Sequence, residues 1–343
     1  MSPAGTCRAP QAAPTALVRG PALLLLFGLC LAAGRAAPAG PPAAPGRLIA
    51  VGDRQLHLLC EGAGSPAVIL HPGTAEFSFD WDMVQHRLAK VTRVCAYDRA
   101  GYAWSDMSPA FERFGAAAED LHDLLEKAGI RPPYILAGHA FGALYVRDYQ
   151  RRYPQQVAGM LLIDPTPEED TQGQMSGNTV SLIDMADHDL VSFPLRPFAP
   201  SRTTPPPRPP ASPEASDPPF DRLPPALQNA RRWAFGRFFH ELEALTPSAA
   251  LAIMESQRAT FDELYKMRHN PQTILDLPVV ILSRGRATTP EIREMQLQLT
   301  RLSTNTTHRF AENCGSQIHI EDPAMVSDAL LRLLGKEPQA APH

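Results

Sequence analysis

Two hydrophobic patterns alternate along most of this chain. Short apolar runs, of the kind that form buried strands, are separated by segments whose apolar residues recur at helical spacing. Gly52-Asp53 separates the first two runs and is typical of a hairpin turn. Strands are predicted at residues 47–51, 55–60, 67–70, 93–97, 134–137, 157–163, 278–283 and 308–312. Helices are predicted at residues 80–90, 115–128, 140–153, 226–240, 249–267, 290–302 and 323–334.

The order of these elements predicts the fold class. A hairpin followed by repeated strand–helix units indicates an α/β fold with a mostly parallel sheet and helices on both faces. We assign residues 47–165 and 276–336 to this core, and residues 337–343 to a tail. Residues 166–275 interrupt the alternation. We expect them to form a helical cap over the carboxyl ends of the strands, where ligands bind in open α/β sheets.

Proline is concentrated in one part of this insertion. Between residues 194 and 225, 13 of 32 residues are proline. Proline removes a backbone donor and fixes φ, so this stretch is incompatible with a helix or a central strand. We expect an exposed, extended and disordered segment.

The N-terminus has the order of regions found in a targeting segment. Arg8 and Arg19 precede an apolar run at residues 22–33, and small residues follow it. This order predicts a secretory signal peptide over residues 1–36 and hence a secreted or extracytoplasmic protein. An uncleaved membrane anchor is the alternative, although the run is shorter than the roughly 20 residues that span a bilayer. Residues 37–46 are rich in Ala, Pro and Gly and are expected to be a disordered lead-in.

Composition and charge narrow the function classes. Hydrophobic residues make up 44% of the chain and charged residues 20%, which suits a globular protein with a core. The formal net charge of -4 gives no reason to expect binding to nucleic acid, and no integral span is expected in the mature chain. The sequence contains no metal-ligand spacing, phosphate loop or dinucleotide fingerprint. We therefore expect no metal and no cofactor.

The most informative chemistry lies in Gly138-His-Ala-Phe-Gly142. The pattern Gly-x-nucleophile-x-Gly is typical of a sharp turn between a strand and a helix. This turn lifts the reactive side chain above the sheet. Gly138 and Gly142 keep the geometry, because a side chain at either place would collide with its neighbours. Ala140 occupies the nucleophile position, and its methyl group has no atom that can attack a carbonyl.

Several segments together resemble the α/β-hydrolase family, in particular its esterase and peptidase-like branch. The most specific is Asp98-Arg-Ala-Gly-Tyr-Ala-Trp-Ser-Asp106. The others are residues 68–73, 93–97, 138–142, 161–164 and 314–323. The resemblance runs from about Arg47 to Leu334, apart from the proline-rich insertion, and implies the α/β-hydrolase fold.

The resemblance also implies three positions for a catalytic triad. Ala140 is at the nucleophile position, and Asp164 is at the acid position after the strand at 157–163. The family histidine precedes the last helix by seven residues, and counting back from Pro323 reaches Ser316. A triad needs a nucleophile, a base that takes its proton, and an acid that orients the base. We therefore expect only the acid to remain.

Five further residues are assigned near this site. His319 lies close to the histidine position and is a possible substitute base, with a solvent-side or helix-edge position as the alternative. His71 ends a strand beside the expected oxyanion loop. The resemblance implies that backbone N–H groups of Thr74 and Phe141 form an oxyanion hole. His139 is expected to be a packing residue.

Cysteines and a sequon bear on the compartment. Cys60 and Cys95 fall on strands that are neighbours in the implied fold, so we expect either a disulfide or two buried thiols. Cys314 is left over, near the expected pocket rim. Asn305-Thr306-Thr307 is a glycosylation sequon, which has meaning in a eukaryotic secretory pathway.

Three functions compete at this point. The loss of a nucleophile and a base favours a non-catalytic pseudohydrolase that binds a small apolar or carbonyl-bearing ligand or a protein partner. An active esterase with a non-standard site around Asp164 and His319 is the first alternative. A structural or interaction protein with a vestigial pocket is the second.

Overall fold

The computed structural model describes residues 41–107, 114–166, 172–175, 178–181, 218–243, 266–267 and 276–336. The chain divides into two units, residues 1–42 and 43–343, and the fold lies in the second. The expected signal peptide, residues 37–40 of the lead-in, most of the proline-rich segment and the tail lie outside the described residues, as does nearly all of the helix predicted at 249–267.

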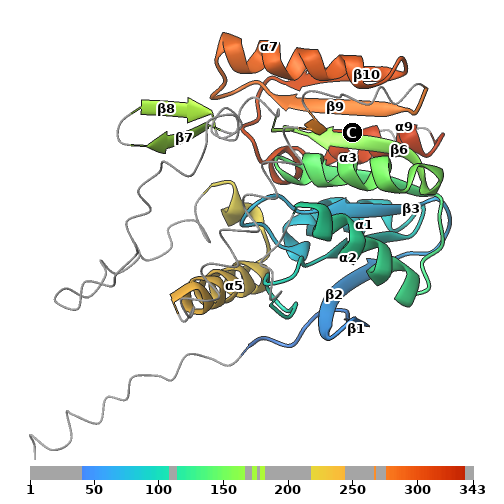
Figure 1. Cartoon of the computed structure of the whole chain (residues 1–343), viewed down its shortest axis with the longest axis vertical. Helices are drawn as coiled ribbons and strands as arrows, with labels where there is room; N and C mark the ends of the chain where they lie inside the picture. The colour runs from blue at the N-terminus through green and yellow to red at the C-terminus, as the bar shows by residue number, and fades with distance from the viewer. Residues whose placement is uncertain are drawn as a thin grey trace, which may run out of the picture. The chain divides into compact units, whose positions relative to one another are not determined.

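The described residues contain one eight-stranded sheet in the order β1-β2-β4-β3-β5-β6-β9-β10 (Figure 1). Only the pairings of β2 with β1 and with β4 are antiparallel, and all other neighbours are parallel. The α/β prediction is therefore confirmed. The strands are β1 Arg47–Val51, β2 Arg54–Glu61, β3 Ala67–His71, β4 Val94–Tyr97, β5 Tyr134–His139, β6 Val157–Ile163, β9 Val279–Arg284 and β10 Thr306–Ala311.

Helices follow the strands close to the predicted bounds. In the core they are η2 Ser78–Trp81, α1 Asp82–Leu88, α2 Phe114–Lys127, α3 Gly142–Arg152, η3 Pro154–Gln156, α7 Pro290–Gln298, η8 Leu299–Leu302, α8 Ile318–Glu321 and α9 Pro323–Leu333. The short helix α8 was not predicted. Among the described residues, every helix is too short or too polar to cross a bilayer.

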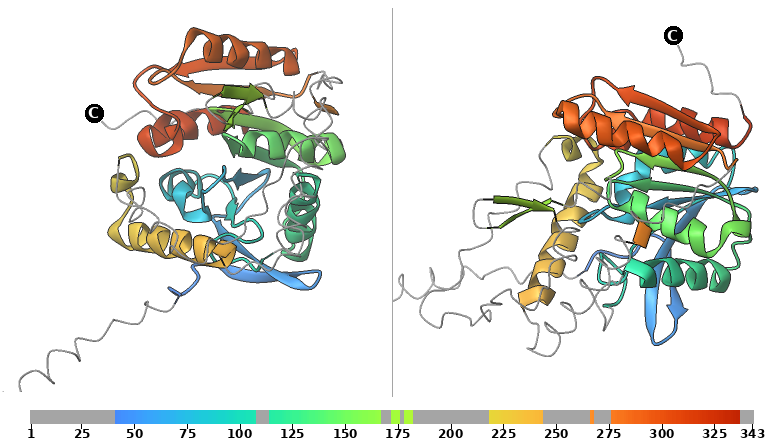
Figure 2. Two further views of the ribbon diagram at one scale, coloured as in Figure 1. Left: turned by 60° about the vertical axis from the view of Figure 1, so that its left-hand side comes forward. Right: turned by 45° about the horizontal axis from the view of Figure 1, so that its top comes forward.

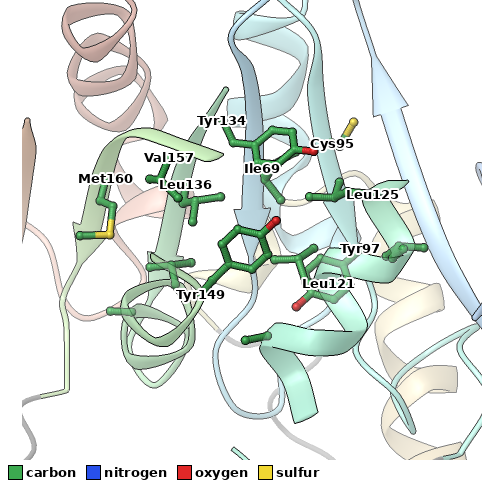
Figure 3. Close-up of a cluster of buried hydrophobic side chains, with 14 of the residues drawn as sticks. Ile69, Cys95, Tyr97, Leu121, Leu125, Tyr134, Leu136, Tyr149, Val157 and Met160 are labelled. Carbon is green, nitrogen blue, oxygen red and sulfur yellow. The ribbon is translucent and has the colours of Figure 1, made fainter. Parts of the chain in front are cut away.

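The sheet separates two hydrophobic cores because successive strand residues face opposite sides. Ile69 lies in one core, whereas its neighbours Val68 and Leu70 lie in the other. Helices α2 and α3 contribute Leu121 and Tyr149 to the first core, which Figure 3 shows. Helices α1 and α9 contribute side chains to the second core, so helices cover both faces of the sheet.

The insertion between β6 and β9 is described in part. It contains a two-stranded sheet of β7 Gln172–Met175 and β8 Asn178–Ser181, which the sequence did not predict, and then η7 Phe220–Arg222 and α5 Pro225–Glu243. Helix α5 confirms the helix predicted at 226–240 (Figure 2). Its residues Ala234 and Phe235 pack against Phe77 and Tyr102, which lie in the loops after β3 and β4. Part of the insertion therefore covers loops at the carboxyl edge of the sheet.

The cysteines and the sequon have clear places in the fold. Cys60 and Cys95 are directly opposite each other on β2 and β4, with Cα atoms 4.1 Å apart, and they form a disulfide. Cys314 is a buried free thiol. Asn305 is exposed directly before β10, and its glycosylation stays a prediction.

Candidate active site

The turn between β5 and α3 has the geometry that its glycines predict. A Cβ atom on Gly138 would lie 2.4 Å from the carbonyl oxygen of Gly142. A Cβ atom on Gly142 would lie 2.7 Å from the carbonyl oxygen of His71. Between them, Ala140 has a φ of 48°, a left-handed conformation that is costly for a residue with a side chain. The backbone therefore presents residue 140 as a nucleophile would be presented, but the side chain is a methyl group.

Asp164 and Ser316 lie together beside this turn. Asp164 follows β6 and is buried, and the Ser316 hydroxyl donates to its Oδ2 at 2.5 Å. The Gln296 amide donates to Oδ1 at 2.9 Å, and the Arg284 backbone N–H lies 3.3 Å from the same oxygen. The residue at the acid position thus contacts the residue at the histidine position, but a hydroxyl stands where a base is needed.

His139 contacts Ser316 from the other side. Its Nε2 lies 2.9 Å from the Ser316 carbonyl oxygen and 3.3 Å from the Ser316 hydroxyl oxygen. A carbonyl oxygen only accepts hydrogen bonds, so Nε2 carries a proton. It therefore has no lone pair to take the proton of Ser316, which is donated to Asp164. The contact lacks the donor–acceptor direction of an activated serine.

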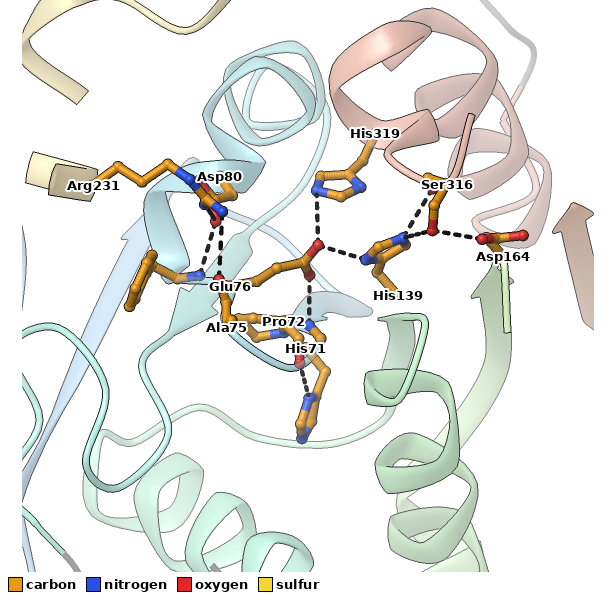
Figure 4. A network of polar contacts seen from close by, with 12 residues as sticks. His71, Pro72, Ala75, Glu76, Asp80, His139, Asp164, Arg231, Ser316 and His319 are labelled. Carbon is orange, nitrogen blue, oxygen red and sulfur yellow. Dashed lines mark hydrogen bonds and ion pairs between the residues drawn. The ribbon is translucent and has the colours of Figure 1, made fainter. Parts of the chain in front are cut away.

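Glu76 completes a buried ion pair with His139 (Figure 4). Its Oε1 lies 2.6 Å from His139 Nδ1, and its Oε2 accepts from the Gly73 backbone N–H at 2.6 Å. Burial is the largest single effect on the pKa of Glu76 and raises it. The lowering effects of His139, of the charge of His319 and of the Gly73 N–H together outweigh burial and hold that pKa well below its usual range. Burial opposes the charge on His139, whereas Glu76 and, more weakly, Asp164 raise its pKa. The prediction that His139 only packs is therefore wrong, since it also forms this ion pair and a hydrogen bond to Ser316.

His319 lies on the far side of Glu76. It is fully buried, with Nε2 4.0 Å from Glu76 Oε1. Its ring stacks on Trp81, with the centroids 4.5 Å apart, and is tilted against His139 at 4.7 Å. Neither ring nitrogen has a hydrogen-bond partner among the residues that the structure describes. Burial lowers the pKa of His319 to about 3, and the charge of His139 acts in the same direction against that of Glu76.

The expectation of a solvent-side or helix-edge position for His319 is therefore wrong. Residues 318–321 form the one-turn helix α8, which turns His319 inward. The contacts that the structure gives to Asp164 come from Ser316, Gln296 and Arg284, whereas those of His319 are with Glu76, Trp81 and His139. In the described residues, the suggested pairing of Asp164 with His319 is not formed.

Sequence reasoning missed Glu76. It lies between β3 and η2, far along the chain from His139 and His319, so no local spacing connects the three. The only available sign was a carboxylate in the otherwise apolar and small-residue segment 72–79. Each of the three residues offers one ligand atom, and these atoms all lie within 4.8 Å of one another. The sequence analysis expected no metal, but the fold assembles a group able to hold one.

The remaining predicted residues lie nearby. His71 is buried at the end of β3, and its ring stacks on Tyr145 with the centroids 5.0 Å apart. Thr74 is exposed in the following loop, and Phe141 begins α3 with its ring 5.3 Å from that of Tyr145. The oxyanion hole assigned to the N–H groups of Thr74 and Phe141 stays a prediction.

Asp98 connects several segments of the core. It is fully buried after β4, and its Oδ2 lies 2.7 Å from His57 Nδ1. Its Oδ1 accepts from the Ser78 backbone N–H at 2.7 Å, and its carbonyl oxygen accepts from the Ser105 hydroxyl at 2.6 Å. These bonds connect β2, η2 and the 99–106 turn.

Sequence comparisons place the chain among known proteins. Residues 67–329 match the family described as alpha/beta hydrolase family. An AB hydrolase superfamily protein of Gibberella zeae is 35% identical over 111 residues, which are 31% of this chain and 34% of that protein. The uncharacterized protein YbdG of Bacillus subtilis is 24% identical over 135 residues, 38% of this chain and 42% of that protein. The chain thus spans less than half the length of these curated relatives.

Solved structures extend the similarity to the whole fold. The epoxide hydrolase CorEH superposes with a TM-score of 0.57 at 16% identity, covering 84% of this chain and 98% of that one. A thermophilic esterase from Thermogutta terrifontis superposes with a TM-score of 0.56 at 17% identity, covering 84% and 96%. At these identities, the likeness concerns the fold alone.

Proposed function

This chain belongs to the alpha/beta hydrolase family, and we propose that within the family it is a pseudohydrolase, with the scaffold but without serine-type acyl transfer. The observation that carries the proposal is the pair of replacements at the turn and at the histidine position. Ala140 has no attacking atom, and Ser316 gives its proton to Asp164 rather than to an imidazole.

The size of the expected loss supports this proposal. In enzymes with a serine triad, removal of triad members leaves only about 10³–10⁴-fold acceleration over water, from binding and the oxyanion hole. Two of the three positions are changed here. Residual hydrolysis of esters should therefore be far below that of an active family member.

Retention of the turn supports a binding role. The left-handed backbone at Ala140 is kept although no reactive atom uses it, and the close approach at Gly138 and Gly142 is kept as well. If the N–H groups of Thr74 and Phe141 still converge, they would attract a carbonyl oxygen or an anion. A small apolar or carbonyl-bearing ligand is our first choice, with a protein partner or a vestigial pocket as alternatives.

One observation favours a second candidate function. Ser316 Oγ, His139 and Glu76 are connected in the order of a serine triad, with separations of 3.3 Å and 2.6 Å. An esterase with Ser316 as nucleophile would use this order. We rank it second because His139 Nε2 faces a carbonyl oxygen and the Ser316 hydroxyl faces a carboxylate, so proton transfer from serine to imidazole would need both bonds to change.

The test uses a fluorophosphonate probe and short-chain aryl esters on the full chain. We expect no labelling and no turnover above a heat-killed control. The double variant Ala140→Ser with Ser316→His restores both missing groups, and it should gain labelling at position 140 if the rest of the site is intact. Labelling of the unchanged protein would refute the pseudohydrolase. If Ser316→Ala abolished that labelling, the second candidate would be established.

A further inference from the structure

Three segments that are distant in sequence bring two imidazoles and a carboxylate to one buried place. Glu76 comes from the loop after β3, His139 from the end of β5, and His319 from α8. All three side chains are at most 3% exposed. From this arrangement, we propose that Glu76, His139 and His319 form a binding site for a zinc-like divalent cation. The site does not involve Ala140, but it shares His139 and Glu76 with the second candidate function.

The hydrogen bonding of His139 supports this site. Nε2 donates to the Ser316 carbonyl oxygen at 2.9 Å, which leaves Nδ1 pointing at Glu76. Nδ1 and Glu76 Oε1 are 2.6 Å apart but are not aligned as a hydrogen bond. The lone pair of Nδ1 and the carboxylate oxygen repel each other at this distance unless a cation lies between them. A metal ion or a proton can be that cation. Histidines that bind metals usually donate their other ring N–H to a carbonyl or carboxylate oxygen, as His139 does.

Glu76 is held in the orientation that a ligand needs. Its Oε2 accepts from the Gly73 N–H at 2.6 Å, so Oε1 is directed toward the imidazoles. A Cβ atom at residue 73 would lie 2.9 Å from that same Oε2, so glycine is what permits the close approach. Bonds from the backbone to the second oxygen of a ligating carboxylate are a common support in metal sites.

His319 supplies the independent observation. Its two ring nitrogens are buried and have no hydrogen-bond partner among the described residues. Burying a polar group without a partner costs free energy. A cation bound to Nε2, which is 4.0 Å from Glu76 Oε1, would satisfy one of them. Stacking on Trp81 holds the ring in place for this contact.

The donor set selects the class of metal. Two imidazole nitrogens and one carboxylate oxygen suit zinc and other late divalent transition metals, whereas magnesium and calcium prefer oxygen ligands. Bonds of about 2.0–2.2 Å from zinc to each atom require His139 and Glu76 to separate slightly and His319 to move closer. Three protein ligands also leave a coordination position for water or a ligand.

The experiment titrates the full chain with Zn²⁺ and Co²⁺ after treatment with a chelator. We expect one equivalent to bind, with Zn²⁺ raising the melting temperature. Bound Co²⁺ should give the absorption bands of four- or five-coordinate nitrogen and oxygen ligation, without a thiolate charge-transfer band. His319→Gln should weaken Zn²⁺ binding by at least about 100-fold, since even loss of an outer-shell partner costs 10–100-fold.

A matched control separates this site from the protein surface. His122, Asp123 and Glu126 on α2 also bring ligand atoms within 4.8 Å of one another, but their side chains are partly or fully exposed. His122→Ala should leave the stoichiometry and the affinity unchanged. The proposal is overturned if His122→Ala abolishes binding while His319→Gln retains it. It is also overturned if the unchanged chain binds no Zn²⁺, or if its bound Co²⁺ has only the spectrum of octahedral oxygen ligation. Both results are obtained with the unchanged protein, so they do not depend on whether a variant folds.

Discussion

Ala140 keeps a backbone conformation that its own side chain does not use. At the flanking residues Gly138 and Gly142, neighbouring backbone atoms lie so close that a Cβ atom would collide with them. The conformation of the turn is therefore set by its surroundings rather than by residue 140. The polar groups around it are equally constrained. Ser316 is bonded to Asp164, and His139 to the Ser316 carbonyl oxygen. At the scale of single residues, the site is a network of polar contacts in which, among the described residues, neither ring nitrogen of His319 has a hydrogen-bond partner.

The strain at Ala140 can be measured. A left-handed conformation costs a residue with a Cβ atom about 1–2 kcal/mol, and glycine avoids this cost. Glycine lowers the free energy of unfolding by about 0.5–1 kcal/mol, however, because its unfolded state has more conformational freedom. Ala140→Gly should therefore raise the free energy of unfolding by up to about 1 kcal/mol in urea. Ala143→Gly inside α3 is the control and should lower it by about 1 kcal/mol or more. Equal destabilisation by both variants would show that the turn is not strained.

His71 should make stability depend on pH. Burial and then the charge of Arg99 lower its pKa from 6.5 to about 3, against smaller opposing effects of the Pro72 carbonyl and Glu76. Between these two values the unfolded chain binds a proton that the folded chain does not, so the free energy of unfolding rises with pH up to 6.5 and then levels off. His71→Phe keeps a ring against Tyr145 and should make this slope shallower, leaving the part that comes from His319, whose pKa burial lowers in the same way.

The measurement for His71 is the urea midpoint at several pH values between 3 and 6.5. His86→Ala is the control, because His86 is exposed and its pKa is raised instead. That variant should keep the rise in stability from acid to neutral pH. An unchanged slope in His71→Phe would mean that other buried groups cause the acid sensitivity.

At the scale of elements, the helix α5 is attached to the core by charge as well as by apolar contacts. Arg231 on α5 and Asp80 in η2 form an ion pair, and both are almost completely buried. The Arg231 guanidinium also lies over the Phe220 ring, 3.6 Å from its centroid. Burial raises the pKa of Asp80 to about 6, although the charge of Arg231 opposes it. An unpaired carboxylate here would be costly.

Breaking this pair should destabilise the protein more than removing it. Arg231→Met leaves a buried carboxylate without its partner, a change that typically costs about 3–5 kcal/mol. The double variant Arg231→Met with Asp80→Asn should recover most of that loss in thermal or urea unfolding. Arg232→Met on the exposed side of α5 is the control and should change stability by less than about 0.5 kcal/mol. A double variant no more stable than Arg231→Met would contradict this account.

At the scale of the whole molecule, the antiparallel edge of the sheet is cross-linked. The Cys60–Cys95 disulfide joins β2 to β4 across a sequence separation of 35 residues. A loop of this length predicts about 2–4 kcal/mol of stabilisation, mainly by restricting the unfolded chain. Cys60→Ala with Cys95→Ala should lower the free energy of unfolding by that amount. The same effect should follow reduction of the unchanged protein.

Cys314→Ala is the control for the loss of a buried sulfur. It removes a free thiol from the second core and should cost less than the double variant. Because this variant keeps the Cys60–Cys95 disulfide, reduction should destabilise it further. If the double variant and Cys314→Ala were equally destabilised, the disulfide would contribute packing rather than a constraint.

Much of the fold could be predicted because hydrophobic periodicity records which side of an element is buried. The apolar runs at 67–70 and 134–137 predict strands, and the observed strands β3 and β5 are buried and lie in the middle of the sheet. The helix α8 and the β7–β8 hairpin were not recognised, because short elements offer too few positions for a period to appear. His319 was misplaced for the same reason, since one helical turn decides which way it faces.

The sequence by itself determined the α/β fold and the chemistry that is absent at residues 140 and 316. A missing hydroxyl or imidazole is a property of the residue and does not depend on distance. Only the tertiary structure decided which other polar side chains lie beside residues 140 and 316. Glu76 comes from the loop after β3, His139 from the end of β5 and His319 from α8. The order of β3 and β5 in the sheet and the inward turn of α8 bring them together. Proximity between distant segments is a property of the folded chain, and no local pattern encodes it.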